Sequence, residues 1–202
     1  MKQKTSVKQI LNDLISIKSQ LKKYYANSKK HKTLLKFLIH RDFEEGKYPM
    51  LKDIEKETGL STYKLRKQLK EIHESVFDYE TGHIFDFSTF EITINVSYYK
   101  RYASFKCNNL GYIPREGESV EIPFLKAKIG IYYFYVEKVM HYFINSTHFI
   151  DIDLKGGLYN SYWSYRLDKA IELEEIEFGD QFDLAKYQIK EKLGLDKRRF
   201  RR

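Results

Sequence analysis

The spacing of apolar residues changes along this chain, and that change constrains the fold more than any other feature. Up to Val76 the apolar side chains recur at intervals of three and four, the period of amphipathic helices. From there to Glu175, Tyr, Phe, Ile and Val alternate with polar residues, which is typical of half-buried strands. Residues 181–193 return to helical spacing. The chain is therefore predicted to be α+β, with helices first, an all-β barrel-like part next and a helix at the end.

Residues 5–25 are predicted to form an amphipathic helix, because their apolar residues fall on one face. Such a face needs a partner surface, either the neighbouring helices or the same helix of a second subunit. The pattern leaves both open, with a homodimer slightly favoured. A second helix is expected to run from about Leu34 to Glu45, where Gly46 ends it.

Two more helices are expected on either side of a tight turn. The first is Leu51–Thr58, and Gly59 suits the turn because glycine adopts positive φ without a steric penalty. The second is Thr62–His73, which Ser61 or Thr62 can cap. Its apolar residues, which continue the helical spacing just beyond that range, are Leu65, Leu69, Ile72 and Val76.

The net charge of +8 is unevenly distributed along the chain. Residues 1–75 carry a net +9, residues 76–180 a net −6, and residues 181–202 a net +5. A polyanion is drawn to places where cations cluster, because binding there releases its counterions. The charge distribution therefore assigns nucleic acid to the helical N-terminal part, with the basic tail either adding a phosphate contact or only keeping the chain soluble.

The stretch LKDIEKETGLSTYKLRKQLKEI, residues 51–72, resembles the helix-turn-helix of bacterial transcription regulators. The shared positions are Ile54, Gly59, Leu60, a capping Ser or Thr, Leu65 and Leu69. The chain departs from that family at Glu55, where a small residue is usual. With the helix before it and a hairpin after it, the likeness becomes winged-helix-like over about residues 30–88. The hairpin is expected around Thr81-Gly82, between Val76–Glu80 and His83–Phe87, where a wing would lie.

A helix can enter the major groove only if its exposed face is polar, cationic and free of acidic side chains. The stretch from Thr62 to Lys70 contains no Asp or Glu. Residues near the start of the helix are placed to reach base edges, and the lysines to reach phosphates; Lys47 and the wing add backbone contacts. The predicted DNA-binding residues are Thr62, Tyr63, Lys64, Arg66, Lys67, Lys70 and Lys47. The alternative is a solvated surface, or a surface that binds a protein.

Catalytic signals in the β part are weak. Asp153-Leu154-Lys155, with Asp151 before it, has the form used by metal-dependent nucleases, but its alternation with apolar residues is also that of an exposed strand face. His141 and His148 lack the spacing of metal ligands. The single cysteine excludes a disulfide framework and a cysteine-rich zinc site. No enzymatic activity, metal or cofactor is expected.

The middle of the chain is expected to serve another purpose. Tyr112–Pro123 is similar to the start of SH3-like small barrels, a likeness extended loosely over residues 110–175. The stretch GGLYNSYWSYR, residues 156–166, is dense enough in aromatics to offer a surface to a protein partner or ligand. This β part could thus be a sensor, a dimerisation unit or a docking surface.

These observations combine into one expectation. The predicted domains are residues 1–28 (helix), 29–88 (helix-turn-helix), 89–178 (β-barrel-like) and 179–202 (helix and basic tail). Charged residues interrupt every apolar run near the N-terminus, so a cytoplasmic protein without a membrane partner is expected. Its expected partner is double-stranded DNA, in the role of a transcriptional regulator. The alternatives are a replication or mobile-element protein of a phage or plasmid, and a structural adaptor that binds protein through the basic helix.

Overall fold

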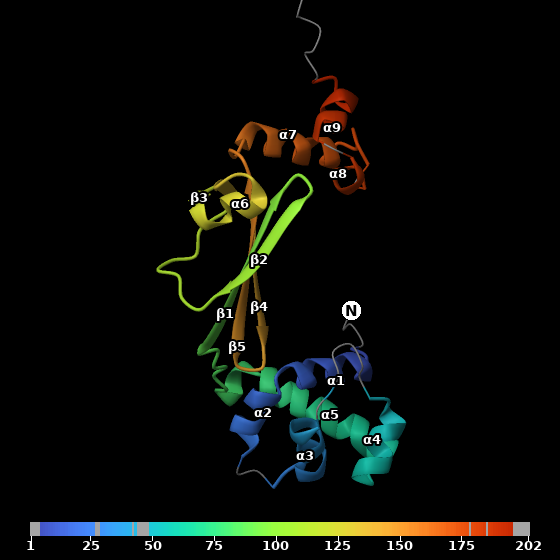
Figure 1. The fold of residues 1–202 in the computed structure, drawn as a ribbon. Coiled ribbons are helices and arrows are strands. Elements are labelled where there is room, and N and C mark those ends of the chain that lie inside the picture. The colour runs from blue at the N-terminus through green and yellow to red at the C-terminus, as the bar shows by residue number, and fades with distance from the viewer. Residues whose placement is uncertain are drawn as a thin grey trace, which may run out of the picture. The chain divides into compact units, whose positions relative to one another are not determined.

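The computed structural model describes residues 5–26, 29–41, 43, 49–177, 179–184 and 186–195 (Figure 1). Helices come first, strands follow and helices return at the C-terminal end, so the predicted α+β class and element order are confirmed. Contacts divide the chain into two compact units. The first comprises residues 1–94, 104–111 and 140–152, and the second residues 95–103, 112–139 and 153–202.

The first unit contains the N-terminal helices. Their bounds are α1 Val7–Ser16, α2 Lys18–Tyr25, α3 Lys32–His40, α4 Leu51–Thr58 and α5 Thr62–Phe77. Helix α1 begins with a capping box, in which the Ser6 hydroxyl accepts a hydrogen bond from the backbone N–H of Gln9, and the Gln9 side chain accepts one from Ser6. Because Ile17 has φ −123° and ψ 29°, the predicted single helix over residues 5–25 is divided in two.

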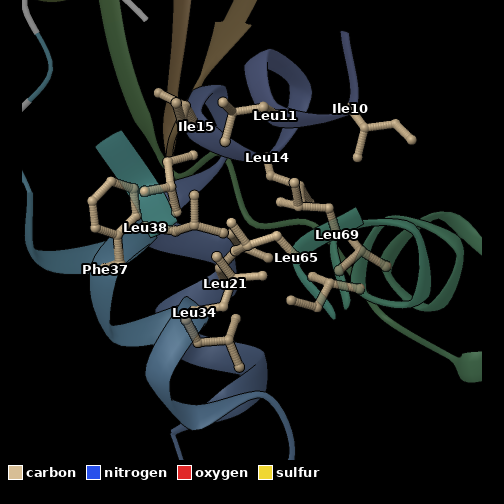
Figure 2. Packing of buried hydrophobic residues seen from close by; sticks show 14 of the residues in the cluster. Ile10, Leu11, Leu14, Ile15, Leu21, Leu34, Phe37, Leu38, Leu65 and Leu69 are labelled. Atoms are coloured by element: carbon tan, nitrogen blue, oxygen red, sulfur yellow. The ribbon is translucent and has the colours of Figure 1, made fainter. Parts of the chain in front are cut away.

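The helices share one apolar core, shown close up in Figure 2. Helix α1 packs on α3 and α5, α2 packs on α3, and α4 packs on α3 and α5. Leu14, Leu38 and Leu69 are each completely shielded from solvent. The apolar face of residues 5–25 is thus covered by neighbouring helices of the same chain, which was one of the two alternatives expected for it.

Two expectations for the helical part are wrong. Helix α3 ends at His40 rather than near Glu45, because Arg41 already has an extended backbone. The hairpin expected at Thr81-Gly82 is not formed, since Val76 and Phe77 continue α5. The chain then makes a 3-10 turn at Tyr79–Thr81 and enters a strand only at Thr89.

Local hydrogen bonds explain why these residues form a turn in place of the expected hairpin. The Asp78 carboxylate accepts a hydrogen bond from the backbone N–H of Glu80 at 3.0 Å. The Thr81 hydroxyl donates to the Ser75 carbonyl at the end of α5, at 2.9 Å. These side-chain contacts satisfy the backbone without a paired strand, as Asp and Thr often do at helix ends.

The strands form one sheet in the order β2-β1-β5-β4-β3. Their bounds are β1 Thr89–Tyr98, β2 Arg101–Cys107, β3 Ser119–Glu121, β4 Tyr133–Ile144 and β5 Thr147–Gly156. Strand β3 is antiparallel to β4, with Val120 opposite Phe134. Strands β1 and β5 run in the same direction, because Thr89 hydrogen-bonds Ser146 where both begin, and Asn95 hydrogen-bonds Asp153 farther along both. Among these described strands β2 and β3 are open edges, so they do not close the barrel expected from the turns.

The β4–β5 turn belongs to the same unit as the helices and is held there by a buried polar side chain. Gln20 on α2 is only 1% exposed. Its Nε2 donates to the carbonyls of Asp86 at 2.6 Å and Asn145 at 2.9 Å, and its Oε1 accepts from the Asp86 N–H at 3.3 Å. The Asn145 N–H in turn donates to the carbonyl of Ser16 at 2.7 Å. A fully bonded amide therefore fastens the hairpin to the α1–α2 junction.

The second unit contains short helices as well as strands. Their bounds are a 3-10 turn Pro123–Leu125, α6 Lys126–Ile129, α7 Ser161–Glu172, α8 Asp180–Asp183 and α9 Lys186–Lys192. The expected all-β character therefore fails over α7, where Asn160 caps a helix by accepting a hydrogen bond from the Trp163 N–H. Ala170, Ile176 and Ile189 are buried together in a small core of this unit.

Candidate nucleic-acid interface

Helix α5 separates an apolar face from a cationic one. Its apolar face lies in the helical core, with Leu65, Leu69 and Ile72 completely buried. This burial fixes the rotation of the helix, so the side chains between them must face outward. The outward-facing residues in its first half are Thr62, Tyr63, Lys64, Arg66, Lys67 and Lys70, all exposed. The structure thus brings six of the seven predicted DNA-binding residues onto one surface, which we call the α5 face.

The turn before α5 has the geometry that its sequence indicated. Gly59 is left-handed at φ 68°, and its N–H donates to the Glu55 carbonyl at 2.8 Å, closing α4. The Thr58 hydroxyl donates to the Ile54 carbonyl at 2.6 Å. Three residues, Gly59 to Ser61, therefore separate the two helices.

The unusual Glu55 has a defined role in this turn. Its side chain is half-buried, and its carboxylate accepts a hydrogen bond from the Thr62 hydroxyl. A carboxylate therefore connects α4 to the start of α5 where the resembling family has a small side chain. Since the Thr62 hydroxyl already has an acceptor, Thr62 is less available to a ligand than the other residues of the α5 face.

The positive charge of the α5 face is strongest in its first half. Among described residues, Lys64, Arg66 and Lys70 form no ion pair, whereas Lys67 lies 4.0 Å from the Glu71 carboxylate. Glu71 also lies 3.2 Å from the imidazole of His31. Burial and the ammonium of Lys30 lower the pKa of His31, against the opposing effect of Glu71. The single carboxylate of Glu71 is thus shared among several basic side chains. The first half of α5 therefore keeps a net positive charge.

Of the other parts of the predicted interface, two lie outside the described residues and the third is not formed. Lys47 lies outside the residues that the structure describes. The same holds for the basic tail after Leu195. The wing is absent from residues 76–87: α5 ends at Phe77, a 3-10 turn follows at Tyr79–Thr81, and residues 83–87 form neither helix nor strand.

The residues of the nuclease-like stretch make ordinary polar contacts with neighbouring side chains. Asp153 Oδ1 accepts a hydrogen bond from Asn95 Nδ2 at 3.0 Å, and Lys155 Nζ donates to Glu137 Oε1 at 2.5 Å. Burial and the Asp151 carboxylate, which hydrogen-bonds the phenol, raise the pKa of Tyr142. Within the described part of the chain no three His, Cys, Asp or Glu residues are grouped so that they could hold a metal ion.

The structure also brings two histidine side chains into contact, which the sequence did not indicate. His141 on β4 and His148 on β5 form a hydrogen bond of 2.8 Å between Nδ1 and Nε2, so one of these nitrogens must be unprotonated. The His148 ring also stacks on Phe143 at 4.4 Å. Burial and the neighbouring His141 lower the pKa of His148. Only a hairpin prediction with the turn at Asn145 could have placed the two rings together.

The aromatic stretch before and within α7 is divided between core and surface. Trp163 is half-buried against the small core of the second unit, with the ammonium groups of Lys186 and Lys190 within 5.4 Å of its ring centre. Tyr162 and Tyr165 are exposed. Part of the predicted aromatic surface is therefore present.

Comparison with protein-family models, with curated proteins and with solved structures finds no match for this chain. Of the described helices, none has the length and apolar character needed to cross a membrane.

Proposed function

We propose that this protein binds double-stranded DNA through the α5 face, as a transcriptional regulator. The observation that carries the proposal is a helix with its apolar side fully buried and its cations exposed at its first three turns. Such a helix is long enough and narrow enough to lie in the major groove. The resemblance to bacterial helix-turn-helix regulators supports the same assignment.

The roles of the residues follow from their chemistry. Arg66 can bond a guanine edge with two parallel N–H groups, and Tyr63, which is 76% exposed, lies near the start of the helix where bases are contacted. Lys64, Lys67 and Lys70 contribute charge toward phosphates. Without the expected wing, the proposal depends on α5 and on the turn that positions it.

The first experiment selects from a random duplex library and then measures affinity for the selected sequence over a salt series. The test variant replaces Lys64, Arg66 and Lys70 by alanine. The matched control replaces Lys8, Lys22 and Lys36, which are exposed on α1, α2 and α3 and remove the same charge. The test variant is expected to lose sequence preference and to lower the salt slope by about 2 to 3, since each phosphate contact contributes about 0.9.

Two results would contradict the proposal. If wild type enriches no sequence, α5 does not read bases. If the control variant loses as much affinity as the test variant, binding reflects only total charge. The identity of the partner distinguishes the two alternatives. An adaptor would bind an acidic protein through the α5 face, and a replication protein would bind a sequence from a phage or plasmid origin.

A further inference from the structure

The turn between β1 and β2 carries a second group of exposed cations and aromatic rings. This turn is Tyr99-Lys100, and Tyr99 is held at φ 50° with its ring 84% exposed. Arg101 and Tyr102 begin β2, and Tyr102 is 68% exposed. Large rings exposed at the tip of a turn contribute little to the fold, so their position favours contact with a partner.

Two observations place this turn beside residues 126–132, which contain α6, follow the turn by about 25 residues in the sequence and are called the α6 segment. The Arg101 guanidinium lies against Gly130, where an added Cβ would approach Nη1 within 2.7 Å. Tyr98 stacks edge-on against Tyr99 at 4.5 Å, and burial together with the neighbouring Tyr99 and Tyr133 raises the pKa of Tyr98. Tyr133 begins β4, directly after the α6 segment.

The α6 segment adds further cations at this place. Lys126 and Lys128 lie on α6 and are exposed. The Lys126 ammonium lies 5.5 Å from the ring centre of Tyr132, which contacts the Tyr133 ring at 5.7 Å. We define the turn patch as Tyr99, Lys100, Arg101, Tyr102, Lys126 and Lys128.

The turn patch is locally positive although residues 76–180 carry a net −6. Within the described residues, its four cations form no ion pair. Elsewhere in the second unit, Lys155, Arg166 and Lys192 are paired with Glu137, Glu175 and Asp180. None of the described acidic residues in the middle of the chain is therefore an ion-pair partner of these four cations. A negative ligand would meet uncompensated positive charge.

We propose that the turn patch binds single-stranded nucleic acid, with Tyr99 and Tyr102 stacking on bases and the four cations contacting phosphates. Unpaired bases offer their faces to aromatic rings, whereas a duplex shows only base edges. An acidic peptide would satisfy the cations but would leave the two exposed tyrosines without a matching surface. This site lies on other residues than the α5 face and does not depend on it.

The test measures binding of a fluorescein-labelled 20-nucleotide single strand of mixed sequence by fluorescence anisotropy, using the full chain over a salt series. One variant replaces Lys100, Lys126 and Lys128 by alanine. Its matched control replaces the exposed Arg115, Lys138 and Lys169, which lie in the same unit outside the turn patch and remove the same charge. A third variant, Tyr99→Asn, removes the ring while asparagine still accepts positive φ.

The lysine variant is expected to weaken binding at least tenfold and to lower the salt slope by roughly 2, from about 0.7 per phosphate contact on single strands. Tyr99→Asn is expected to weaken binding about tenfold without changing the slope, as for loss of a stacking ring. The control should stay within about twofold of wild type, since charges away from a site have little effect on it.

Three outcomes would overturn the proposal. They are an absence of single-strand binding by wild type, equal losses in the lysine variant and its control, and unchanged binding by Tyr99→Asn. The Lys64, Arg66 and Lys70 variant separates the two proposals. If it loses duplex binding but retains the single strand, the α5 face and the turn patch are distinct sites. If it retains duplex binding but loses the single strand, the single strand binds at the α5 face and both proposals fail.

Discussion

The α5 face and the turn patch both expose unpaired cations, but they are built in opposite ways. The cations of the α5 face come from seven consecutive residues, 64–70, and the burial of Leu65 and Leu69 on the other side directs them outward. The turn patch combines residues 99–102 with residues 126–128, and the Arg101 guanidinium lies against Gly130 where the two segments meet. Helical spacing therefore reveals a surface from local sequence, whereas a patch assembled from distant segments leaves no local pattern.

The two surfaces also differ in what accompanies the charge. The α5 face has one exposed ring, Tyr63, and otherwise flexible cationic side chains. The turn patch has Tyr99 and Tyr102 at the tip of a hairpin. Long cations match phosphates and base edges in a duplex groove, while exposed rings match the faces of unpaired bases. Duplex and single strand are therefore the ligands that best distinguish the two surfaces.

The largest expected effect tests whether the two units unfold separately. Leu69→Ala empties a fully buried position of the helical core and should lower stability by about 2–5 kcal/mol. Urea unfolding is followed by circular dichroism and by the fluorescence of Trp163, the single tryptophan, which lies in the second unit. We expect the circular dichroism transition to move to lower urea more than the Trp163 transition does.

The reciprocal variant is Phe134→Ala, at a position 1% exposed in the second unit. It should lower the free energy of unfolding reported by Trp163 fluorescence by about 3–5 kcal/mol. The circular dichroism transition of the helices should change less. If both variants shift both signals together, the chain unfolds as one cooperative structure, and duplex and single-strand binding cannot be lost independently by unfolding.

A second effect concerns the junction that fastens the β4–β5 turn to the helices. Gln20→Leu keeps the side-chain size but leaves the N–H of Asp86 and the carbonyl of Asn145 without these partners. The expected cost is about 1–3 kcal/mol, measured by the urea midpoint of the helical signal. Ser19→Ala, at an exposed neighbouring position, is the control and should change stability by less than about 0.5 kcal/mol. Equal costs in the two variants would mean that the buried amide does not hold the hairpin.

A third, smaller effect tests how the turn patch is assembled. Gly130 at φ 96° and Gly157 at φ 112° both lie where an L side chain is strained, so alanine at either should cost about 1–2 kcal/mol. Only at Gly130 would the new Cβ meet Arg101, because nothing lies within 4 Å of the position at Gly157. Gly130→Ala should therefore also weaken single-strand binding, as measured by anisotropy. Equal binding by the two variants would show that the Arg101 contact does not shape the turn patch.

The smallest expected effect is a difference between the two units in how their stability depends on pH. Since the pKa of His148 is lowered in the fold, the unfolded chain binds more protons, and the first unit should lose stability as pH falls below about 6.5. The pKa of Asp180 is lowered by its hydrogen bond to Lys192, so the stability it contributes is present above its ordinary pKa and is lost only below about pH 4. Thermal unfolding of His148→Gln should show a weaker dependence between pH 7 and 5, against a His40→Gln control.

A residual dependence on pH is expected in that variant, because the pKa of His31 is also lowered, mainly by burial. An unaltered dependence in His148→Gln would mean that the histidine pair does not couple protonation to the stability of the hairpin.

Much of the helical part was predictable from sequence. Leu51–Thr58, the glycine turn and the start of the next helix at Thr62 are present as the spacing indicated. The predictions were wrong where side chains hydrogen-bond the backbone. The alternating aromatics after Val76 indicated a hairpin, but the hydrogen bond from the Thr81 hydroxyl to the Ser75 carbonyl stabilises a turn instead. Helix α7 was missed because its many tyrosines favour strands when read by propensity alone.

The α+β class, the α4–α5 turn and the exposed residues of α5 could all be inferred from the amino-acid sequence, because each follows from spacing within a few residues. Three arrangements became known from the folded structure: α1 and α2 join the common core, β1 and β5 run in the same direction, and residues 99–102 lie beside Gly130 at the end of α6. These arrangements depend on contacts between segments far apart in the chain, which burial and hydrogen bonding select together and no local pattern records.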